Sequence, residues 1–510
     1  MIVGGINIGS NSSLALIEEG KLIYYNEERK LTKIKHGSGI PYNCIEQILN
    51  KKIDECYVAS YDFVKSDLLN LKNYLKFKKI LSTNNFLSLH KPHHLTHLFK
   101  AYIDSGFTSA RVFVLDGRGS KWGDGVEVCS IYDIDNSNVK CLYKKIYNNK
   151  NKKIVYGDNE LGINSNTKFE VTDKLTLGCF YAIVSSYFGY DLEEGKFMGL
   201  QSYGKVDNEL LEKFKTGIKK EDIEQIPFTL DSARTCQSFF EYEYLDLVDK
   251  YKSENMVFTG GATLNVVNNY KLQRKFSESN IYFEPICGDE GNSIGAAYTH
   301  YIKNQKKIYP NKDVYLGQEI KTRESNEILK PNVEVIDIID LLNKGEVVGF
   351  IQGKAEAGPR ALGNRSLLLD PTIKNAKDKM NEIKKRENFR PFACSILEKN
   401  YNEFFYVNEL DKSPFMMVAP QSKEKTKVMT PSIVHVDGTC RVQTITKETN
   451  ENLFNLLINF KLPYIMNTSF NLAGYPIVET FEDVLFTLNN SNLKYVYFAD
   501  EKKLLIKNAI

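Results

Sequence analysis

The sequence has no run of apolar residues long enough for a membrane-spanning helix, which needs about eighteen or more. Residues 1–5 also lack the basic region and long apolar stretch of a secretory signal. We therefore expect a cytoplasmic protein with no membrane partner. The nine cysteines form no C-x-x-C pair, so neither a zinc ribbon nor a thioredoxin-like site is indicated, and we expect reduced, packed thiols.

A strong charge of either sign is also missing. The chain of 510 residues has 67 Lys and Arg against 64 Asp and Glu, for a net charge of +3. Proteins that bind polyanions usually carry a strongly basic domain, so we expect no obligatory nucleic-acid partner, although a local basic patch is not excluded. Hydrophobic residues make up 42% and charged residues 26%, which is typical of globular proteins, and the length favours two or three domains.

Several catalytic motifs are absent as well. We find no G-x-S-x-G elbow, H-E-x-x-H pair, Walker A loop or G-x-G-x-x-G unit between a strand and a helix. Serine nucleophiles, zincins, P-loop enzymes and dinucleotide oxidoreductases are therefore disfavoured. No internal repeat is evident.

Two hairpins with small polar loops are present in the N-terminal half. The expected strands cover residues 2–8, 14–17, 22–25, 112–115 and 126–132. The first loop, residues 9–13, includes Ser12, and the second begins at Asp116. Such loops hold nucleotide phosphates on backbone N–H groups in actin-like and sugar-kinase folds, although most hairpins of this kind bind nothing.

Further along the chain, apolar spacing predicts three helices, over residues 173–187, 293–298 and 335–343. Residues 193–200 contain two glycines and are expected to break the first of them. A strand at 256–258, the pair Gly260 and Gly261, and a helix start make a plausible seat for an adenosine or its phosphate. The basic, Asn-rich residues 144–153 are expected to form a solvated loop.

A domain boundary is expected in the weakly periodic, Lys-, Asn- and Glu-rich residues 304–331. We place the domains at residues 1–325 and 326–510.

Histidines gather in the run that includes His93, His94 and His97. Pro92 suits the first turn of a helix, on which His93 and His97 stand one turn apart on one face. Two such imidazoles can bind one metal ion if carboxylates come from elsewhere in the chain. The alternative is a helix whose histidines are packed and satisfied.

A second group of residues is cationic and is interleaved with Gly and Asn. It consists of Lys354, Arg360, Arg365, Arg386, Arg390 and Arg441. Arginine recognises phosphate and carboxylate with paired N–H groups, so several arginines that converge on one pocket would hold a polyanion. Scattered surface arginines are the alternative.

These motifs resemble those of the O-carbamoyltransferase family that includes the tobramycin, cephamycin and nodulation-factor carbamoyltransferases. The matching stretches are residues 93–97, 114–117, 194–200, 260–265, 288–291, 358–366, 390–393, 435–443 and 467–471. The resemblance implies an α/β protein with an N-terminal actin-like ATPase domain, related to sugar kinases and the threonylcarbamoyl transferase, and a C-terminal YrdC-like α/β domain.

The resemblance also implies a chemistry. The C-terminal domain would form carbamoyl-adenylate from carbamoyl phosphate and ATP with Mg²⁺, and the N-terminal domain would pass the carbamoyl group to the hydroxyl of a small-molecule, sugar or nucleotide acceptor. Arg360, Arg365 and Arg441 would be catalytic. The residues implied to bind nucleotide or carbamoyl phosphate are Ser12, Lys196, Gly199, Gly260, Gly261, Asn265, Lys354, Arg390, Asn467 and Ser469.

A metal site is implied in the N-terminal domain. Its ligands to an iron-type divalent ion would be His93, His97, Asp116 and Asp289. Asp116 would also be catalytic, and His94 would be a base or a packing residue. The resemblance leaves a homodimer open.

The sequence departs from this family in its first loop, which usually reads Gly-His-Asp but here reads Gly9-Ser10-Asn11. Relatives also tend to carry an aromatic residue at Ala357 and an acid at Tyr475. Two rival functions stay open. A tRNA-modifying threonylcarbamoyl enzyme is disfavoured by the near-neutral charge and by the C-terminal motifs. A nucleotide-binding regulator without catalysis is supported only by Ser10 and Asn11.

Overall fold

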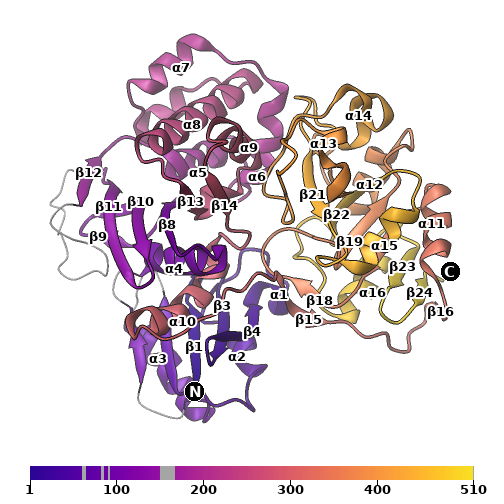
Figure 1. Ribbon diagram of the computed structural model, residues 1–510, viewed down its shortest axis with the longest axis horizontal. Helices are drawn as coiled ribbons and strands as arrows, with labels where there is room; N and C mark the ends of the chain where they lie inside the picture. The colour runs from indigo at the N-terminus through magenta and orange to yellow at the C-terminus, as the bar shows by residue number, and fades with distance from the viewer. Residues whose placement is uncertain (60–64, 82–84, 90–91, 150–166, 509–510) are drawn as a thin grey trace. The chain divides into compact units, whose positions relative to one another are not determined.

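The computed structural model describes residues 1–59, 65–81, 85–89, 92–149 and 167–508. They form two compact α/β units (Figure 1). The N-terminal unit comprises Met1–Thr32, His36–Asn265 and Lys271–Asp313, and the C-terminal unit comprises Lys33–Lys35, Val266–Tyr270 and Val314–Ile510. The main division falls earlier in the chain than the boundary expected after residue 325. No helix in the described part of the chain is long and apolar enough to cross a membrane.

The first sheet of the N-terminal unit has the strand order β4-β3-β1-β6-β7. Its strands are β1 (Ile2–Asn7), β3 (Ser13–Glu18), β4 (Lys21–Glu27), β6 (Glu55–Ala59) and β7 (Phe86–Ser88). β1 runs antiparallel to β3 and parallel to β6. Helix α10 (Asn292–Lys303) packs against β1 so closely that a Cβ on Gly5 would lie 1.9 Å from the carbonyl oxygen of Ser293.

The second sheet has the order β12-β11-β10-β8-β13-β14. Its strands are β8 (Ser109–Leu115), β10 (Gly125–Asp135), β11 (Asn138–Tyr147), β12 (Lys168–Thr172), β13 (Asn255–Thr259) and β14 (Asn280–Phe283), and β9 (Lys121–Trp122) pairs with β10. In both sheets an antiparallel three-stranded meander continues into two parallel strands. The unit therefore repeats one topology, although the sequence shows no repeat.

The remaining elements of this unit are mainly helical. They are α1 (Glu28–Thr32), α2 (Tyr42–Glu46), α3 (Lys65–Phe77), α4 (His93–Ser105), α5 (Leu177–Tyr187), α6 (Glu194–Leu200), α7 (Asn208–Lys215), α8 (Leu230–Lys250), and the short strands β2 (Gly9–Ser10) and β5 (Ser38–Gly39). Helix α9 (Val266–Lys275) contributes residues to both units.

The C-terminal unit is built on an eight-stranded sheet with the order β16-β24-β23-β17-β19-β22-β20-β21. The strands are β16 (Ile328–Lys330), β17 (Val348–Ile351), β19 (Arg365–Leu369), β20 (Ala393–Leu397), β21 (Arg441–Ile445), β22 (Tyr464–Ser469), β23 (Tyr495–Phe498) and β24 (Lys503–Ile506), and β15 (Tyr315–Glu319) pairs separately with β18 (Lys354–Glu356). The helices are α11 (Val335–Asn343), α12 (Ala376–Lys384), α13 (Tyr401–Phe404), α14 (Glu424–Met429), α15 (Glu451–Asn459) and α16 (Phe481–Asn489).

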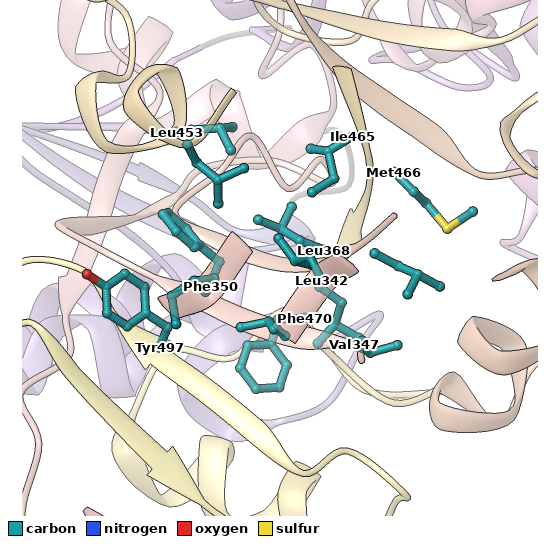
Figure 2. Packing of buried hydrophobic residues seen from close by; sticks show 14 of the residues in the cluster. Leu342, Val347, Phe350, Leu368, Leu453, Ile465, Met466, Phe470 and Tyr497 are labelled. Carbon is teal, nitrogen blue, oxygen red and sulfur yellow. The ribbon is translucent and has the colours of Figure 1, made fainter. Parts of the chain in front are cut away.

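Apolar side chains from the sheet and its helices form one continuous core in this unit. Figure 2 shows Phe350 and Leu368 from the central strands beside Leu342 of α11 and Leu453 of α15. All four are fully buried, and each such side chain contributes about 1.5–3 kcal/mol of hydrophobic stabilisation. The central strands, including β19 that follows the loop of residues 357–364, are therefore supported by this core.

Most of the expected elements are confirmed, and one expectation is wrong. The five hairpin strands and the helix over residues 335–343 are present. Helix α5 ends at Tyr187 as expected, and residues 194–200 form the separate helix α6, which contains both glycines. Residues 144–147 belong to β11, and Lys144 is fully buried rather than solvated. Residues 150–153 lie outside the described residues.

Candidate metal and anion sites

Four side chains from distant parts of the N-terminal unit meet in one group. Each of His93, His97, Asp116 and Asp289 offers a ligand atom, and these atoms all lie within 4.8 Å of one another. Helix α4 begins at His93 directly after Pro92, which sets the two imidazoles one turn apart with ring centroids 4.9 Å apart. Asp116 follows β8, and Asp289 begins a short 3-10 helix.

The inner atoms of this group face one another. Nε2 of His93 lies 2.8 Å from Oδ2 of Asp116 and 3.3 Å from Oδ1 of Asp289. Nε2 of His97 lies 3.9 Å and 3.6 Å from the same two oxygens. The other oxygen of Asp116 accepts the N–H groups of Gly117 at 2.9 Å and Gly261 at 3.1 Å, so the carboxylate is held with Oδ2 toward the imidazoles.

In this buried group, imidazoles and carboxylates shift one another's pKa values. Burial opposes a charge on His93, but the carboxylates of Asp289 and Asp116 outweigh it and raise the pKa of His93 well above 6.5. Burial likewise opposes the charge on Asp289, yet the facing imidazoles lower the pKa of Asp289. Two imidazole nitrogens and two carboxylate oxygens this close together are a donor set that suits one divalent metal ion.

The glycine pair at the end of β13 lies beside this group. Gly261 donates to Asp116, and Gly260 has a φ of 89°, with a Cβ there lying 2.3 Å from the carbonyl oxygen of Leu115. Ser12 is fully buried, and its hydroxyl has no hydrogen-bond partner in the part of the chain that the structure describes. The N–H groups of Gly260 and Gly261 donate to Cys287 and Asp116, so among these positions the Ser12 hydroxyl is the donor without a partner, and the phosphate-binding role of the glycine pair stays a prediction.

The other residues expected to bind nucleotide in this unit have protein partners. The carboxamide of Asn265 exchanges hydrogen bonds with that of Gln237 at 3.0 and 3.2 Å. On α6, Lys196 pairs with Glu193 at 2.5 Å, and Gly199 is buried. Their nucleotide roles stay predictions.

His94 points away from the four-residue group into the protein. It is fully buried, and Nδ1 lies 2.7 Å from the hydroxyl of Ser130. Burial lowers the pKa of His94 to about 3. This placement favours the packing alternative over a base, for which reach to an acceptor is required.

Four arginines share one neighbourhood in the C-terminal unit. Burial and the positive charges of Arg360, Arg386 and Arg390 lower the pKa of Arg441 well below 12.5. Arg386 stacks on Phe392 with its guanidinium carbon 4.0 Å from the ring centroid. Mutual repulsion of this kind is relieved when an anion binds between the guanidinium groups. We call these four residues, with Lys384, the cationic group.

Lys384 at the end of α12 was not foreseen from the sequence. It is 4% exposed, and its ammonium donates to the carbonyl of Ser469, to the Ser469 hydroxyl at 3.2 Å, and to two oxygens of Asn471 at 3.0 Å each. Burial and the charges of Arg386 and Arg390 lower the pKa of Lys384 well below 10.5. In the sequence Lys384 stands next to Lys385 and Arg386, a pattern typical of a solvated helix end. Only its burial in the structure shows that it belongs to this site.

The structure also joins Ser469 to this neighbourhood, since it accepts from Lys384. Asn467 is fully buried and donates to the Ser395 hydroxyl at 2.8 Å, while its Oδ1 has no partner within the described ranges. Two residues of the expected set stand apart. Lys354 is exposed on β18, and Arg365 is fully buried with its terminal N–H groups on backbone carbonyls.

Comparisons with known proteins cover most of the chain. A family model described as the carbamoyltransferase N-terminus matches residues 57–243 and 231–298, and one described as the carbamoyltransferase C-terminus matches residues 339–503. The uncharacterized protein MJ1051 of Methanocaldococcus jannaschii is 30% identical over 99% of this chain and 98% of its own length.

A second relative has a descriptive name. Nodulation protein NolNO of Sinorhizobium fredii is 26% identical over 95% of this chain and 77% of its own length. Among solved structures, full-length HypF in its phosphate- and nucleotide-bound form is 17% identical, with a TM-score of 0.34 over 60% of this chain and 55% of HypF. That score is too low to assign a fold.

Proposed function

The chain belongs to the carbamoyltransferase family and is a transferase, and from that premise we propose that it is an ATP-dependent O-carbamoyltransferase. The donor is carbamoyl phosphate, the intermediate is carbamoyl-adenylate, and the acceptor is a hydroxyl of a small molecule, sugar or nucleotide. The C-terminal unit, as a YrdC-like domain, forms the adenylate, and the N-terminal unit, as an actin-like ATPase domain, transfers the carbamoyl group. The reaction takes place in the cytoplasm and needs no membrane or nucleic-acid partner.

The two half-reactions balance as follows. Water cleaves carbamoyl phosphate to carbamate and phosphate, and a carbamate oxygen then attacks the α-phosphorus of ATP while pyrophosphate leaves. In the second half-reaction the acceptor oxygen attacks the carbamoyl carbon, AMP leaves, and the hydroxyl proton is lost. The product is a carbamate ester.

The observation that carries the proposal is the cationic group. Its members lower one another's pKa values, and both substrates of the first half-reaction are polyanions that would offset this repulsion. Within the protein, Glu387 offsets part of it through its pair with Arg390 at 3.7 Å. Each charge-assisted hydrogen bond to a phosphate is worth about 1.5–3 kcal/mol, and the same donors stabilise charge that develops on the α-phosphorus. Mg²⁺ accompanies ATP in this site.

The second half-reaction is assigned to the four-residue group of the N-terminal unit. His93, His97, Asp116 and Asp289 would hold a divalent iron ion, which when bound supplies Lewis acidity and a fixed point for the phosphate of the adenylate. The chain itself orients the ligands, since the N–H groups of Gly117 and Gly261 hold the carboxylate of Asp116 in place.

Turnover of defined substrates tests the proposal. The full-length protein is mixed with ATP, Mg²⁺ and carbamoyl phosphate, pyrophosphate release is followed, and a panel of hydroxyl acceptors is then examined by mass spectrometry for carbamate esters. Pyrophosphate release that requires carbamoyl phosphate supports the proposal. A requirement for threonine and bicarbonate instead would support the tRNA-modifying alternative, and no pyrophosphate release with any donor would support the regulator.

A further inference from the structure

The loop that carries Arg360 is held from inside by two buried charges of opposite sign, Glu356 and Arg365. Both side chains are 0% exposed. One carboxylate oxygen of Glu356 accepts three backbone N–H groups of the loop, from Leu362 at 2.7 Å, Asn364 at 2.8 Å and Arg365 at 3.1 Å. A single carboxylate therefore gathers the N–H side of the loop.

Arg365 ties the end of this loop, at Asn364, to the two neighbouring segments that contain Gln318 and Gly353. Its Nη1 donates to the carbonyls of Gln352 at 2.6 Å and Asn364 at 2.8 Å, and its Nη2 donates to those of Gln318 at 2.6 Å and Gly353 at 3.0 Å. Each terminal N–H group of this guanidinium has an acceptor, and the side chain is closed to solvent, while its Nε–H has no hydrogen-bond partner among the described residues. The terminal N–H groups are therefore not available to a phosphate oxygen.

Neutral side chains complete the frame. The carbonyl of Leu362 accepts from Gln443 at 2.8 Å and from the hydroxyl of Tyr315 at 2.8 Å, and the carbonyl of Gly363 accepts from Gln352 at 2.9 Å. Gly363 has a φ of 105°, a conformation that favours glycine. The loop backbone is thus fixed before any ligand arrives.

We infer that Glu356 and Arg365 are positioning residues that fix the loop so that Arg360 is held at the phosphate site, and that Arg365 is not itself a phosphate ligand. The physical need is clear from the cationic group. Arg360 and Arg441 carry like charges, which disfavours their close approach. The hydrogen bonds of Leu362 and Asn364 to Glu356 hold the following part of the loop in place against that repulsion. Preorganised charges stabilise a transition state without paying for reorganisation during the reaction. The inference rests on the proposed function.

The test compares two arginines on one loop. Arg360 and Arg365 are each replaced by Lys, which keeps the charge, and by Met, which does not. The control is Arg111→Lys, because Arg111 also donates to backbone carbonyls, of Tyr251 and Lys252, but lies in the N-terminal unit. Pyrophosphate release is measured well below the unfolding temperature, and binding of inorganic pyrophosphate is titrated at several salt concentrations.

A positioning role predicts that Arg365→Lys and Arg365→Met slow pyrophosphate release alike, by about 30- to 300-fold, because neither side chain bridges the carbonyls. The salt dependence of pyrophosphate binding stays as in the wild type. Arg360→Met flattens that dependence and Arg360→Lys preserves it, while Arg111→Lys changes nothing. The inference is overturned if Arg365→Lys is active while Arg365→Met is not, with a flattened salt dependence, since Arg365 would then act by charge.

Two other variants decide the matter if the Arg365 variants do not fold. Glu356→Ala, which removes the acceptor of three loop N–H groups, is expected to slow pyrophosphate release by about 30- to 300-fold. Tyr315→Phe, which removes one bond to the loop, is expected to slow it by about three- to tenfold. In both variants the salt dependence of pyrophosphate binding should stay as in the wild type, and a folded Glu356→Ala with wild-type release would contradict the inference.

Pyrophosphate binding needs no turnover, so the two proposals fail separately. A wild-type protein that binds pyrophosphate but releases none from ATP and carbamoyl phosphate contradicts the proposed function, while the binding titrations still test the frame.

Discussion

The two units place opposite kinds of polar chemistry in their candidate sites. In the N-terminal unit two imidazoles face two carboxylates, and the charges compensate one another within 4.8 Å. In the C-terminal unit the cationic group lowers the pKa values of its own members, so like charges stand close together there. The difference teaches that the two groups suit ligands of opposite sign, which is why we propose a metal cation for the first and a polyanion for the second.

The largest expected effect concerns stability and separates the units. Lys144 and Glu127 form a buried pair, with Nζ 2.7 Å from Oε2 and both side chains 0% exposed. Lys144→Met leaves a buried, unpaired carboxylate, which destabilises the protein by about 3–5 kcal/mol. Denaturant unfolding measures the loss. The matched control is Lys250→Met, whose exposed pair with Asp246 is worth about 0–1 kcal/mol.

Equal unfolding midpoints for these two variants would show that the Lys144 pair is not the buried support described. At low temperature, where the variant is folded, pyrophosphate release by the C-terminal unit should be unchanged.

The second expected effect concerns the cationic group itself. Arg441→Ala should remove about 2–4 kcal/mol of transition-state stabilisation and slow pyrophosphate release by about 30- to 1,000-fold. Arg323→Ala is the control, because Arg323 is exposed and pairs with Glu482 in the same unit. If Arg441→Ala releases pyrophosphate at the wild-type rate, the assignment of the cationic group to the first half-reaction is wrong.

The smallest effect is a change in a pH profile. The ammonium of Lys384 holds the oxygens of Ser469 and Asn471 beside the arginines only while it is protonated, and its pKa is lowered by burial and by Arg386 and Arg390. Pyrophosphate release should therefore fall, by about tenfold, at an alkaline pH below about 10.4, where an ordinary lysine titrates. Lys384→Arg should move that limb to higher pH. An unmoved limb would mean that another group is responsible.

Stability should change in the opposite direction over the same pH window. Between the lowered pKa of Lys384 and the ordinary lysine value, the unfolded chain binds more protons than the native protein. The contribution of Lys384 to the free energy of unfolding therefore rises with pH, while activity falls. A wild-type and Lys384→Arg comparison in denaturant checks the sign.

Much of the fold and part of the four-residue group could be predicted, because the sequence patterns that indicate them are local. Alternating apolar residues gave the hairpin strands, and the spacing of His93 and His97 behind Pro92 predicted one helix face. The convergence of Asp116 and Asp289 on that face came from the family resemblance, since the two carboxylates are far apart in sequence. The repeated topology could not be predicted from the sequence, because the order in which the strands pair repeats while their side chains do not.

The burial of charged residues was not predictable. Lys144 stands in a basic run and Lys384 at a helix end, and both look solvated until the strand or helix is packed. Arg365 is a residue type that often binds phosphate, but here it donates to the backbone carbonyls of Gln318 and Gly353. No sequence pattern indicates these contacts. Residue type indicates the chemistry that is available, and only the folded chain shows where it is used.

The most direct measurement follows both half-reactions in one sample of His93→Ala. Metal content, pyrophosphate release and carbamate ester are determined together, with His300→Ala as control, since His300 is a buried histidine paired with Glu55 away from the four-residue group. If the units divide the work, His93→Ala loses metal and ester but continues to release pyrophosphate, and His300→Ala keeps all three. If His93→Ala keeps its metal, or loses pyrophosphate release in parallel with transfer, the division of labour is wrong.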